Sequence, residues 1–280
     1  MSVYPWVIVG TDGSATATQA VLRAAVLAAR LLAPLLVASA FHPTRPEDLG
    51  PPSLRAQMPG EGWAAIAYRA ATDTVQEAAA LAAQATGVEV TTATPEGEPA
   101  TALLDLAEAR PDSLLVVGSQ GMTASARWLL GNVPNKVTHH AVGDVLVART
   151  GQDVDGKPPD RLLIATDGSA TARRAVQRGV ELAAALGAQV TLLTADSDPQ
   201  RAGDVIAAAA KEAEAAGVVW GADVRASAPP DAILDAAPGH DLVVVGSKGM
   251  AGAARFLLGS VPNTVSHHIT TDLLIVGTDA

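Results

Sequence analysis

Short, wholly apolar runs alternate along the chain with longer segments in which apolar residues recur every three or four positions. Residues 6–11 form such a run and predict a buried strand, and residues 14–32 show the helical period, with Ser14 placed to cap the helix. The same pattern predicts further strands over 34–41, 88–97, 113–119 and 144–150, and helices over 73–87, 99–110 and 133–141. Apolar strands that alternate with helices indicate an α/β fold, in which a parallel sheet is covered by helices on both faces.

The chain contains two copies of this pattern. The segment TDGSATATQAV beginning at Thr11 returns as TDGSATARRAV beginning at Thr166, and the segment that opens with GSQGM at Gly118 returns with GSKGM at Gly246. We therefore predict a tandem duplication, with one domain over residues 1–150 and a second over 160–280, joined through the polar stretch 149–161. Ligands of such sheets bind at the carboxyl ends of the strands, so each domain predicts one site there.

The first copy is longer than the second between these two landmarks. The additional residues are assigned to 41–70, which begin with a Pro- and Gly-rich segment and are typical of a loop that leads into a helix. Two interpretations of this insertion are open. It is either a surface insertion without a role in binding or a flap over the site of the first domain.

Composition narrows the classes of partner. The 280 residues are 49% hydrophobic, 17% charged and 3% aromatic, which supplies packed cores of Ala, Val and Leu. There is no cysteine, which excludes disulfides and thiolate metal sites and fits a cytoplasmic location. The net charge of −10 argues against nucleic acid, whose phosphates need a basic face. No apolar run reaches the roughly 20 residues that span a bilayer, so we expect no membrane partner either.

A glycine-spaced loop follows an apolar strand in each half. In the first half Gly118 and Gly121 allow the backbone to turn with its N–H groups exposed, and Gly131 stands directly before a predicted helix whose first turn contains Pro134. A glycine-lined loop that runs into a helix N-terminus presents free N–H groups and a partial positive charge, which favours a phosphate group. The spacing fits neither a P-loop nor the Gly-x-Gly-x-x-Gly pattern of dinucleotide-binding folds.

The loops, together with the upstream TDGS segments, resemble the ATP-binding type of universal stress protein in tandem form. The motif of that family is Gly-x2-Gly-x9-Gly-Ser/Thr, and Gly246, Gly249, Gly259 and Ser260 match it in full. The first half matches at its three glycines, whereas Asn132 replaces the serine or threonine. The resemblance covers both halves. It implies doubly wound, Rossmann-like domains, each with a five-stranded parallel sheet, packed as a pseudo-twofold dimer through their last strands.

The resemblance also implies which residues contact the nucleotide. Asp12 and Asp167 would hold the adenosine end of ATP, and the main chain near Ala40 and Ala195 would read the adenine. In the first half, the expected contacts are Gly10, Thr11, Asp12, Ala40, Gly118, Gly121, Met122, Thr123, Gly131, Asn132 and Val133. In the second half, where alanine replaces the first glycine, they are Ala165, Thr166, Asp167, Ala195, Gly246, Gly249, Met250, Ala251, Gly259, Ser260 and Val261.

These features predict a regulatory protein of the stress response that binds ATP, with or without Mg²⁺, and forms a homodimer. The sequence names no protein partner. The alternative is an enzyme on the same fold, either a slow ATPase or an adenylyl-transferring protein. Such an enzyme needs a base or a water-positioning group near the γ-phosphate. The loops supply no convincing base among their candidates Ser119, Gln120, Thr123, Ser247 and Lys248. Binding without efficient turnover is therefore favoured.

Two pairs of adjacent histidines, His139–His140 and His267–His268, occupy matching places in the two halves. Adjacent residues on a helix point about 100° apart, so such a pair cannot easily bind one metal ion. We expect the pairs on a polar helix surface or at a contact between the halves.

Overall fold

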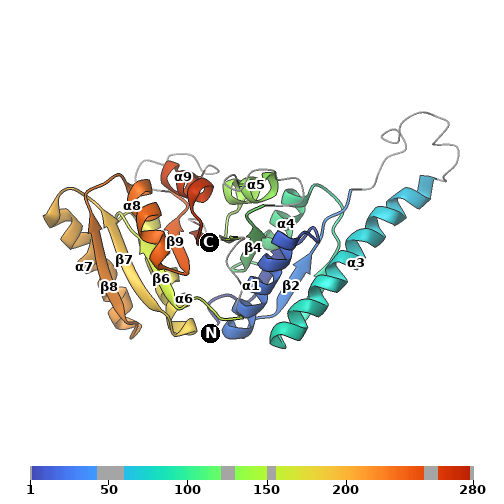
Figure 1. The fold of residues 1–280 in the computed structure, drawn as a ribbon, viewed down its shortest axis with the longest axis horizontal. Coiled ribbons are helices and arrows are strands. Elements are labelled where there is room, and N and C mark those ends of the chain that lie inside the picture. The colour runs from blue at the N-terminus through green and yellow to red at the C-terminus, as the bar shows by residue number, and fades with distance from the viewer. Residues whose placement is uncertain (1, 43–59, 121–129, 150–155, 249–257, 278–280) are drawn as a thin grey trace.

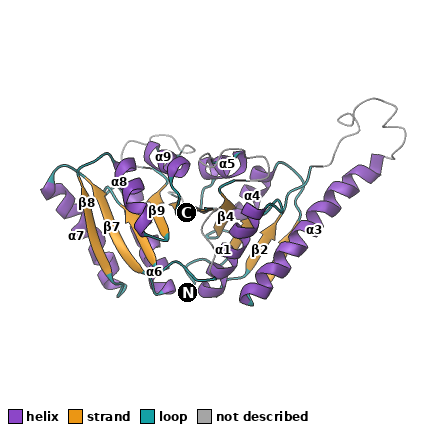
Figure 2. Cartoon of the chain, viewed as in Figure 1, coloured by secondary structure: helices purple, strands orange, loops and turns teal. Residues whose placement is uncertain are grey.

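The computed structural model describes residues 2–42, 60–120, 130–149, 156–248 and 258–277 (Figures 1 and 2). The first half contains β1 (Val7–Gly10), α1 (Ala15–Leu31), β2 (Leu35–Ala38), α3 (Gly60–Thr86), β3 (Val90–Ala93), α4 (Pro99–Glu108), β4 (Leu114–Gly118), α5 (Asn132–His140) and β5 (Asp144–Ala148). The second half contains β6 (Arg161–Ala165), α6 (Ala170–Leu186), β7 (Gln189–Ala195), α7 (Pro199–Ala215), β8 (Trp220–Arg225), α8 (Pro229–Ala236), η2 (Ala237–Gly239), β9 (Leu242–Gly246), α9 (Ser260–His268) and β10 (Asp272–Val276).

In the described part of the chain, ten strands form one continuous sheet in the order β3-β2-β1-β4-β5-β10-β9-β6-β7-β8. Neighbouring strands are parallel within each half. At the centre β5 and β10 run antiparallel, with Leu146 opposite Leu274. The last strands therefore join the two halves about a pseudo-twofold axis. This confirms the doubly wound α/β class, with a five-stranded parallel sheet in each half.

Helices cover both faces of the sheet, and each layer has its own apolar core. Helices α1, α3, α6 and α7 pack on one face, where successive strands contribute residues such as Val7 and Val9. Helices α4, α5, α8 and α9 pack on the other face, to which Ile8 points. The helix surfaces that face the sheet are rich in alanine; Ala20 and Ala24 of α1 are fully buried. Small side chains let the helices lie close to the strands, which compensates for the shortage of aromatic residues.

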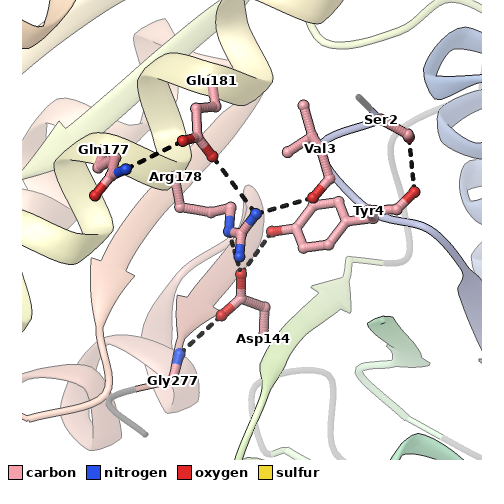
Figure 3. Close-up of polar contacts among 8 residues, drawn as sticks. All are labelled: Ser2, Val3, Tyr4, Asp144, Gln177, Arg178, Glu181 and Gly277. Carbon is pink, nitrogen blue, oxygen red and sulfur yellow. Dashed lines mark hydrogen bonds and ion pairs between the residues drawn. The ribbon is translucent and has the colours of Figure 1, made fainter. Parts of the chain in front are cut away.

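The two halves are also joined by a buried polar cluster beside β5 (Figure 3). Asp144 Oδ2 accepts a hydrogen bond from the Tyr4 hydroxyl at 2.8 Å and lies 3.0 Å from Arg178 Nε. Asp144 Oδ1 accepts from the Gly277 backbone N–H at 3.0 Å. Burial, followed by the charge of Asp144, raises the pKa of Tyr4 well above its ordinary value, so the phenol keeps its proton and donates. First-half residues Tyr4 and Asp144 are thus fixed to Arg178 and Gly277 of the second half.

The first half differs from the sequence prediction around its insertion. Helix α3 begins at Gly60 rather than at residue 73, so the second part of the predicted loop is helical. Glycines at 60 and 62 disfavour helix locally, so the sequence pattern did not indicate that the helix begins here. The helix is tied to the end of β2 by Tyr68, whose ring meets that of Phe41 edge-on, with 5.3 Å between centroids. Residues 43–59 lie outside the described residues, and none of the described helices is long and apolar enough to cross a membrane.

Candidate functional site

Each half has a cleft at the point where the strand order of its sheet reverses. From β1 the chain continues to β2 on one side, while β4 lies on the other, and the carboxyl ends of β1 and β4 form the floor of what we call the first cleft. Its empty volume, including space open to solvent, is about 880 Å³. Its described lining residues are Gly10, Thr11, Asp12, Ala17, Ala38, Ala40, Pro99, Leu103, Val117, Gly118, Gln120, Gly131, Asn132, Val133 and Pro134.

The second cleft lies at the corresponding ends of β6 and β9. Its empty volume is about 560 Å³ on the same measure. Its described lining residues are Ala165, Thr166, Asp167, Ala172, Leu193, Ala195, Pro229, Ile233, Val245, Gly246, Lys248, Val261 and Pro262. The charged Lys248 thus takes the place that neutral Gln120 holds in the first cleft.

An aspartate forms part of the rim of each cleft. Asp12 Oδ1 accepts a hydrogen bond from the Ser14 backbone N–H at 3.0 Å, and the Ser14 hydroxyl caps α1 by accepting from Ala17 N–H at 3.2 Å. The second half repeats this turn, with 2.9 Å between Ser169 N and Asp167 Oδ1. Both aspartates are exposed. The local turn therefore fixes one carboxylate at the rim of each cleft.

The ends of each glycine loop are held together where the strand stops. Gly131 N–H donates to the Ser119 carbonyl at 2.9 Å, and the equivalent bond closes the second loop at 2.8 Å. Gly131 is also the N-cap of α5, and it supplies no side-chain hydrogen bond to the helix. Asn132 and Val133, the first two residues of α5, line the first cleft. Uncapped N–H groups and the positive end of the helix dipole therefore form one wall, an arrangement that suits an anion.

The first strands of the two halves differ at one position in the clefts. A Cβ built on Gly10 would lie 2.6 Å from Cδ1 of Leu103, so the glycine allows α4 to approach β1 closely. In the second half Ala165 occupies this position, and the cleft there is lined by Ile233 of α8. The two clefts are therefore similar in plan but not in shape.

A second difference concerns the two helices that line the first cleft. Glu98 is the N-cap of α4; it accepts from the N–H groups of Ala100 and Thr101 and pairs with Lys136 of α5 at 2.8 Å. Burial opposes its ionised form, but the hydrogen bonds from Lys136 and Thr101 prevail and lower the pKa of the Glu98 carboxyl to about 2. The corresponding N-cap of α8 is Ala228, which makes no side-chain bond. This link between the helices is thus specific to the first half.

The structure brings together most of the residues that the sequence indicated. Gly10, Thr11, Asp12, Ala40, Gly118, Gly131, Asn132 and Val133 line the first cleft. Ala165, Thr166, Asp167, Ala195, Gly246 and Val261 line the second. Gly259 and Ser260 do not line it, although they directly precede Val261. Gly121, Met122, Thr123, Gly249, Met250 and Ala251 lie outside the described residues.

Sequence reasoning missed the walls supplied by α4 and α8. Pro99 and Leu103 line the first cleft, and Pro229 and Ile233 line the second. Each pair is a proline at the helix start followed by an aliphatic residue one turn later. That repetition between the halves was a signal that could have found them.

The histidines contribute to the contact between the halves. His139 Nε2 lies 3.1 Å from Oδ1 of Asn263, which joins α5 to α9 where the two helices lie side by side (Figure 1). Burial lowers the pKa of His267, and the nearby charges of His268 and Arg149 lower it further. Among the described residues no three His, Cys, Asp or Glu side chains gather as metal ligands. The expectation of a contact between halves is confirmed for His139.

Comparisons with known proteins agree with this fold. The family model described as "Universal stress protein family" matches residues 4–149, 159–206 and 195–277. Universal stress protein Rv1636 of Mycobacterium tuberculosis is 35% identical over 150 residues, which is 54% of this chain and 99% of that protein. The crystal structure of a universal stress protein from Archaeoglobus fulgidus superimposes with a TM-score of 0.80 and 19% identity, covering 99% of both chains.

A third similar protein is a universal stress protein crystallised in complex with cAMP. It is 36% identical and covers 42% of this chain and 96% of its own, with a TM-score of 0.38. The family model matches nearly the whole chain, in both halves. The chain therefore belongs to the universal stress protein family.

Proposed function

We propose that the chain binds one ATP molecule in each cleft and that nucleotide occupancy regulates a protein partner in the stress response. The observation that carries this proposal is the uncapped N-terminus of α5, which lies in the wall of a cleft whose rim holds Asp12. The second half has a similar arrangement, in which Val261 of the uncapped first turn of α9 lines the wall and Asp167 stands at the rim. The helix N-terminus in each cleft suits a phosphate chain, and the aspartate at the rim offers an acceptor for ribose hydroxyls.

The described lining of each cleft comes from a single half of the chain. All described residues of the first cleft lie before residue 135, and all those of the second lie after residue 164. We therefore propose that residues 1–150 and 160–280 are the two binding domains. The adenine would lie against apolar residues such as Leu103 and Val117, within reach of the main chain at Ala40. The phosphates, with or without Mg²⁺, would lie toward the glycine loop.

Binding without turnover is the favoured form of this function. Among the described residues that line the first cleft, Asp12 is the one carboxylate, and one of its oxygens accepts the Ser14 N–H. Proton abstraction in a slow ATPase requires a base beside the γ-phosphate, at the far end of the cleft from Asp12 in the proposed pose. Native mass spectrometry of the freshly purified protein separates the two functions, because bound ATP supports a binding protein and bound ADP supports an ATPase.

The assembly of whole chains is a separate proposal. Strands β5 and β10 are already paired with one another, so the sheet edges left in the described part of the chain are β3 and β8. Unpaired edges tend to associate, and we propose that two chains form a cytoplasmic homodimer. Light scattering at micromolar concentration tests this state, and a mass of one chain would contradict it.

The binding proposal is tested by calorimetric titration of ATP into the Asp12→Ala, Asp167→Ala and double variants. Each single variant should retain one site, and the double variant should retain none that is measurable. Losing a hydrogen bond to a charged group weakens binding by roughly 10- to 150-fold. Asp73→Ala on the exposed surface of α3 is the matched control and should bind like the parent chain. Two sites of full affinity in the double variant would refute the proposal. Tighter binding of cAMP than of ATP would show that the ligand is a cyclic nucleotide rather than a triphosphate.

A further inference from the structure

A threonine in the first turn of α1 is bonded to the start of the glycine loop. The Thr16 hydroxyl donates to the carbonyl oxygen of Gln120 at 2.9 Å, although the two residues are 104 positions apart. In the second half the Thr171 hydroxyl makes the same bond to the carbonyl of Lys248. Gln120 and Lys248 each line a cleft. The same long-range bond thus occurs twice, at equivalent places.

This bond is unlike those of other threonines on the helices. Thr18, two residues further along α1, donates to the Ser14 carbonyl four residues back, at 3.0 Å, which is the ordinary local bond of a helical threonine. Thr16 stands too near the helix start to have a helical carbonyl four residues before it. Its hydroxyl is therefore available for a distant acceptor, and the fold supplies Gln120.

The hydroxyl is also the last member of a series of hydrogen bonds that passes from Asp12 through the backbone N–H and the hydroxyl of Ser14. A hydroxyl has one hydrogen, so Thr16, which donates to Gln120, must accept from Ser14, whose Oγ lies 2.9 Å away. Ser14 N–H in turn donates to Asp12 Oδ1 at 3.0 Å. The second half has the same chain from Asp167 through Ser169 to Thr171, with 3.2 Å between the two hydroxyls. The aspartate at the rim and the start of the glycine loop are thus connected through the first turn of the helix.

Close packing makes the bond possible. A Cβ built on Gly118 would lie 3.4 Å from the Thr16 carbonyl oxygen, and one built on Gly246 would lie 3.0 Å from that of Thr171. The first glycine of each loop therefore leaves room for the helix start. Thr16 itself does not line the first cleft. By binding the Gln120 carbonyl, it keeps that oxygen, which would repel an anion, directed at α1.

We infer that Thr16 and Thr171 are positioning residues for phosphate: they fix the carbonyl groups of Gln120 and Lys248 and keep these oxygens turned away from an anionic ligand. This inference rests on the proposed function, because it assigns a device to the phosphate end of the same clefts. A positioning residue of this kind acts on the phosphates and leaves the adenosine contacts unchanged. A general folding defect would weaken both.

The test uses the full chain with Asp167→Ala, so that the first site alone is measured, and compares Thr16→Val, Thr16→Ser and Thr18→Val. We expect Thr16→Val to weaken ATP binding by roughly 2- to 10-fold, the worth of one ordinary hydrogen bond, and to leave adenosine binding unchanged. Thr16→Ser keeps the hydroxyl and should restore ATP affinity. Thr18→Val removes a local bond on the same helix and should have no effect on either ligand.

Three results would overturn the inference: unchanged ATP affinity in Thr16→Val, an equal loss for adenosine and ATP, or no recovery in Thr16→Ser. If the Asp167→Ala parent itself binds no ATP, the proposed function fails and this inference fails with it. If instead the Asp167→Ala parent binds ATP and the Thr16→Val variant binds it equally well, the proposed function stands and only this inference fails. Melting temperatures of all variants show whether any loss reflects unfolding.

Discussion

Arg23 and Asp272 form an ion pair across the two halves of the molecule, with 2.7 Å between Arg23 Nε and Asp272 Oδ2. The pair has a counterpart in Arg178 and Asp144, at 3.0 Å, in which the second half supplies the arginine (Figure 3). Each arginine lies on the first helix of its half, and each aspartate opens the last strand of the other half. All four side chains are largely buried. The halves therefore hold one another through reciprocal charges beside the central pair of strands.

Replacing Arg178 should destabilise the chain far more than replacing an exposed arginine. Arg178→Met leaves the carboxylate of Asp144 buried without its cation and removes the bond to the Val3 carbonyl, which predicts a loss of about 3 kcal/mol in the free energy of unfolding. Arg161 is 59% exposed and 3.7 Å from Asp241, so Arg161→Met should cost less than about 1 kcal/mol. Urea denaturation measures both values, and equal losses would show that the buried pair adds nothing.

The reciprocal arrangement is broken at one pair of positions. The backbone N–H groups of Arg149 and Gly277 donate to Asp272 and Asp144 respectively, as pseudo-symmetry requires. Arg149, however, carries a long side chain whose guanidinium reaches the Ser266 carbonyl near the end of α9. Burial lowers the pKa of Arg149 to about 10, so the group remains charged at neutral pH. At Gly277 the backbone of Val142 and Gly143 lies so near that it leaves no room for a side chain.

Gly277→Ala should therefore be strongly destabilising. The new Cβ would lie 2.1 Å from the Val142 carbonyl oxygen and 2.9 Å from that of Gly143, and both atoms belong to backbone that cannot swing aside. The clash would separate Gly277 N–H from Asp144, and we expect a loss of more than about 2 kcal/mol. Gly239→Ala in the same half meets open space and should change stability by less than about 0.5 kcal/mol. A melting temperature of Gly277→Ala equal to that of Gly239→Ala would contradict the expected clash.

The fold could be predicted from the sequence where each strand is buried on both faces. Residues such as Leu114–Gly118 of β4 are apolar without interruption, and this pattern, repeated in both halves, indicated a parallel sheet. The predicted bounds were wrong at β3, which was expected over 88–97 and spans Val90–Ala93, and at the start of α3. Strand β3 is an edge strand with exposed positions, so the pattern gave it no clear end. The start of α3 was missed because the glycines at 60 and 62 disfavour helix locally.

The candidate site was predictable to the extent that its residues form a repeated local motif. Asp12 and Gly131 stand beside turns and helix starts whose chemistry can be recognised in a few consecutive residues. Leu103 belongs to a helix that crosses the sheet, and its place in the cleft depends on how closely Gly10 lets that helix approach. The bond from Thr16 to Gln120 joins distant segments. Neither could be predicted without the tertiary packing.

The link between α4 and α5 makes a prediction about pH. The pKa of Glu98 is lowered from 4.5 to about 2, so its ionised form stabilises the folded chain above pH 4.5, and this contribution is lost as the pH falls from 4.5 toward 2. Lys136→Met removes one of the hydrogen bonds responsible, and the pKa of Glu98 should rise while the bonds from Thr101 remain. Because both partners are partly exposed, the effect on stability should stay below about 1 kcal/mol.

A carboxyl-detected NMR titration measures the Glu98 pKa directly. Lys211→Met, which removes an exposed lysine on α7, is the control and should leave that pKa unchanged. An identical Glu98 pKa in the parent chain and in Lys136→Met would show that Lys136 does not stabilise the carboxylate in solution.

The two sites should differ in affinity, with the second binding ATP more tightly. Lys248 places a positive charge in the second cleft where the first has Gln120, and the phosphate chain would lie at this side of the cleft. Exposed charges in water contribute up to about 1 kcal/mol, so the preference should be at most about 5-fold and should shrink as salt is added. Ala165 lines the smaller cleft and would oppose this preference by crowding the adenosine. The ordering is measured by titrating ATP into Asp12→Ala, which retains the second site, and into Asp167→Ala, which retains the first.

Adding Lys248→Gln to Asp12→Ala should abolish the advantage for ATP and leave adenosine binding unaffected, because adenosine carries no phosphate for the lysine to attract. Tighter ATP binding by Asp167→Ala than by Asp12→Ala would show that the charge of Lys248 is outweighed by the shape of its cleft.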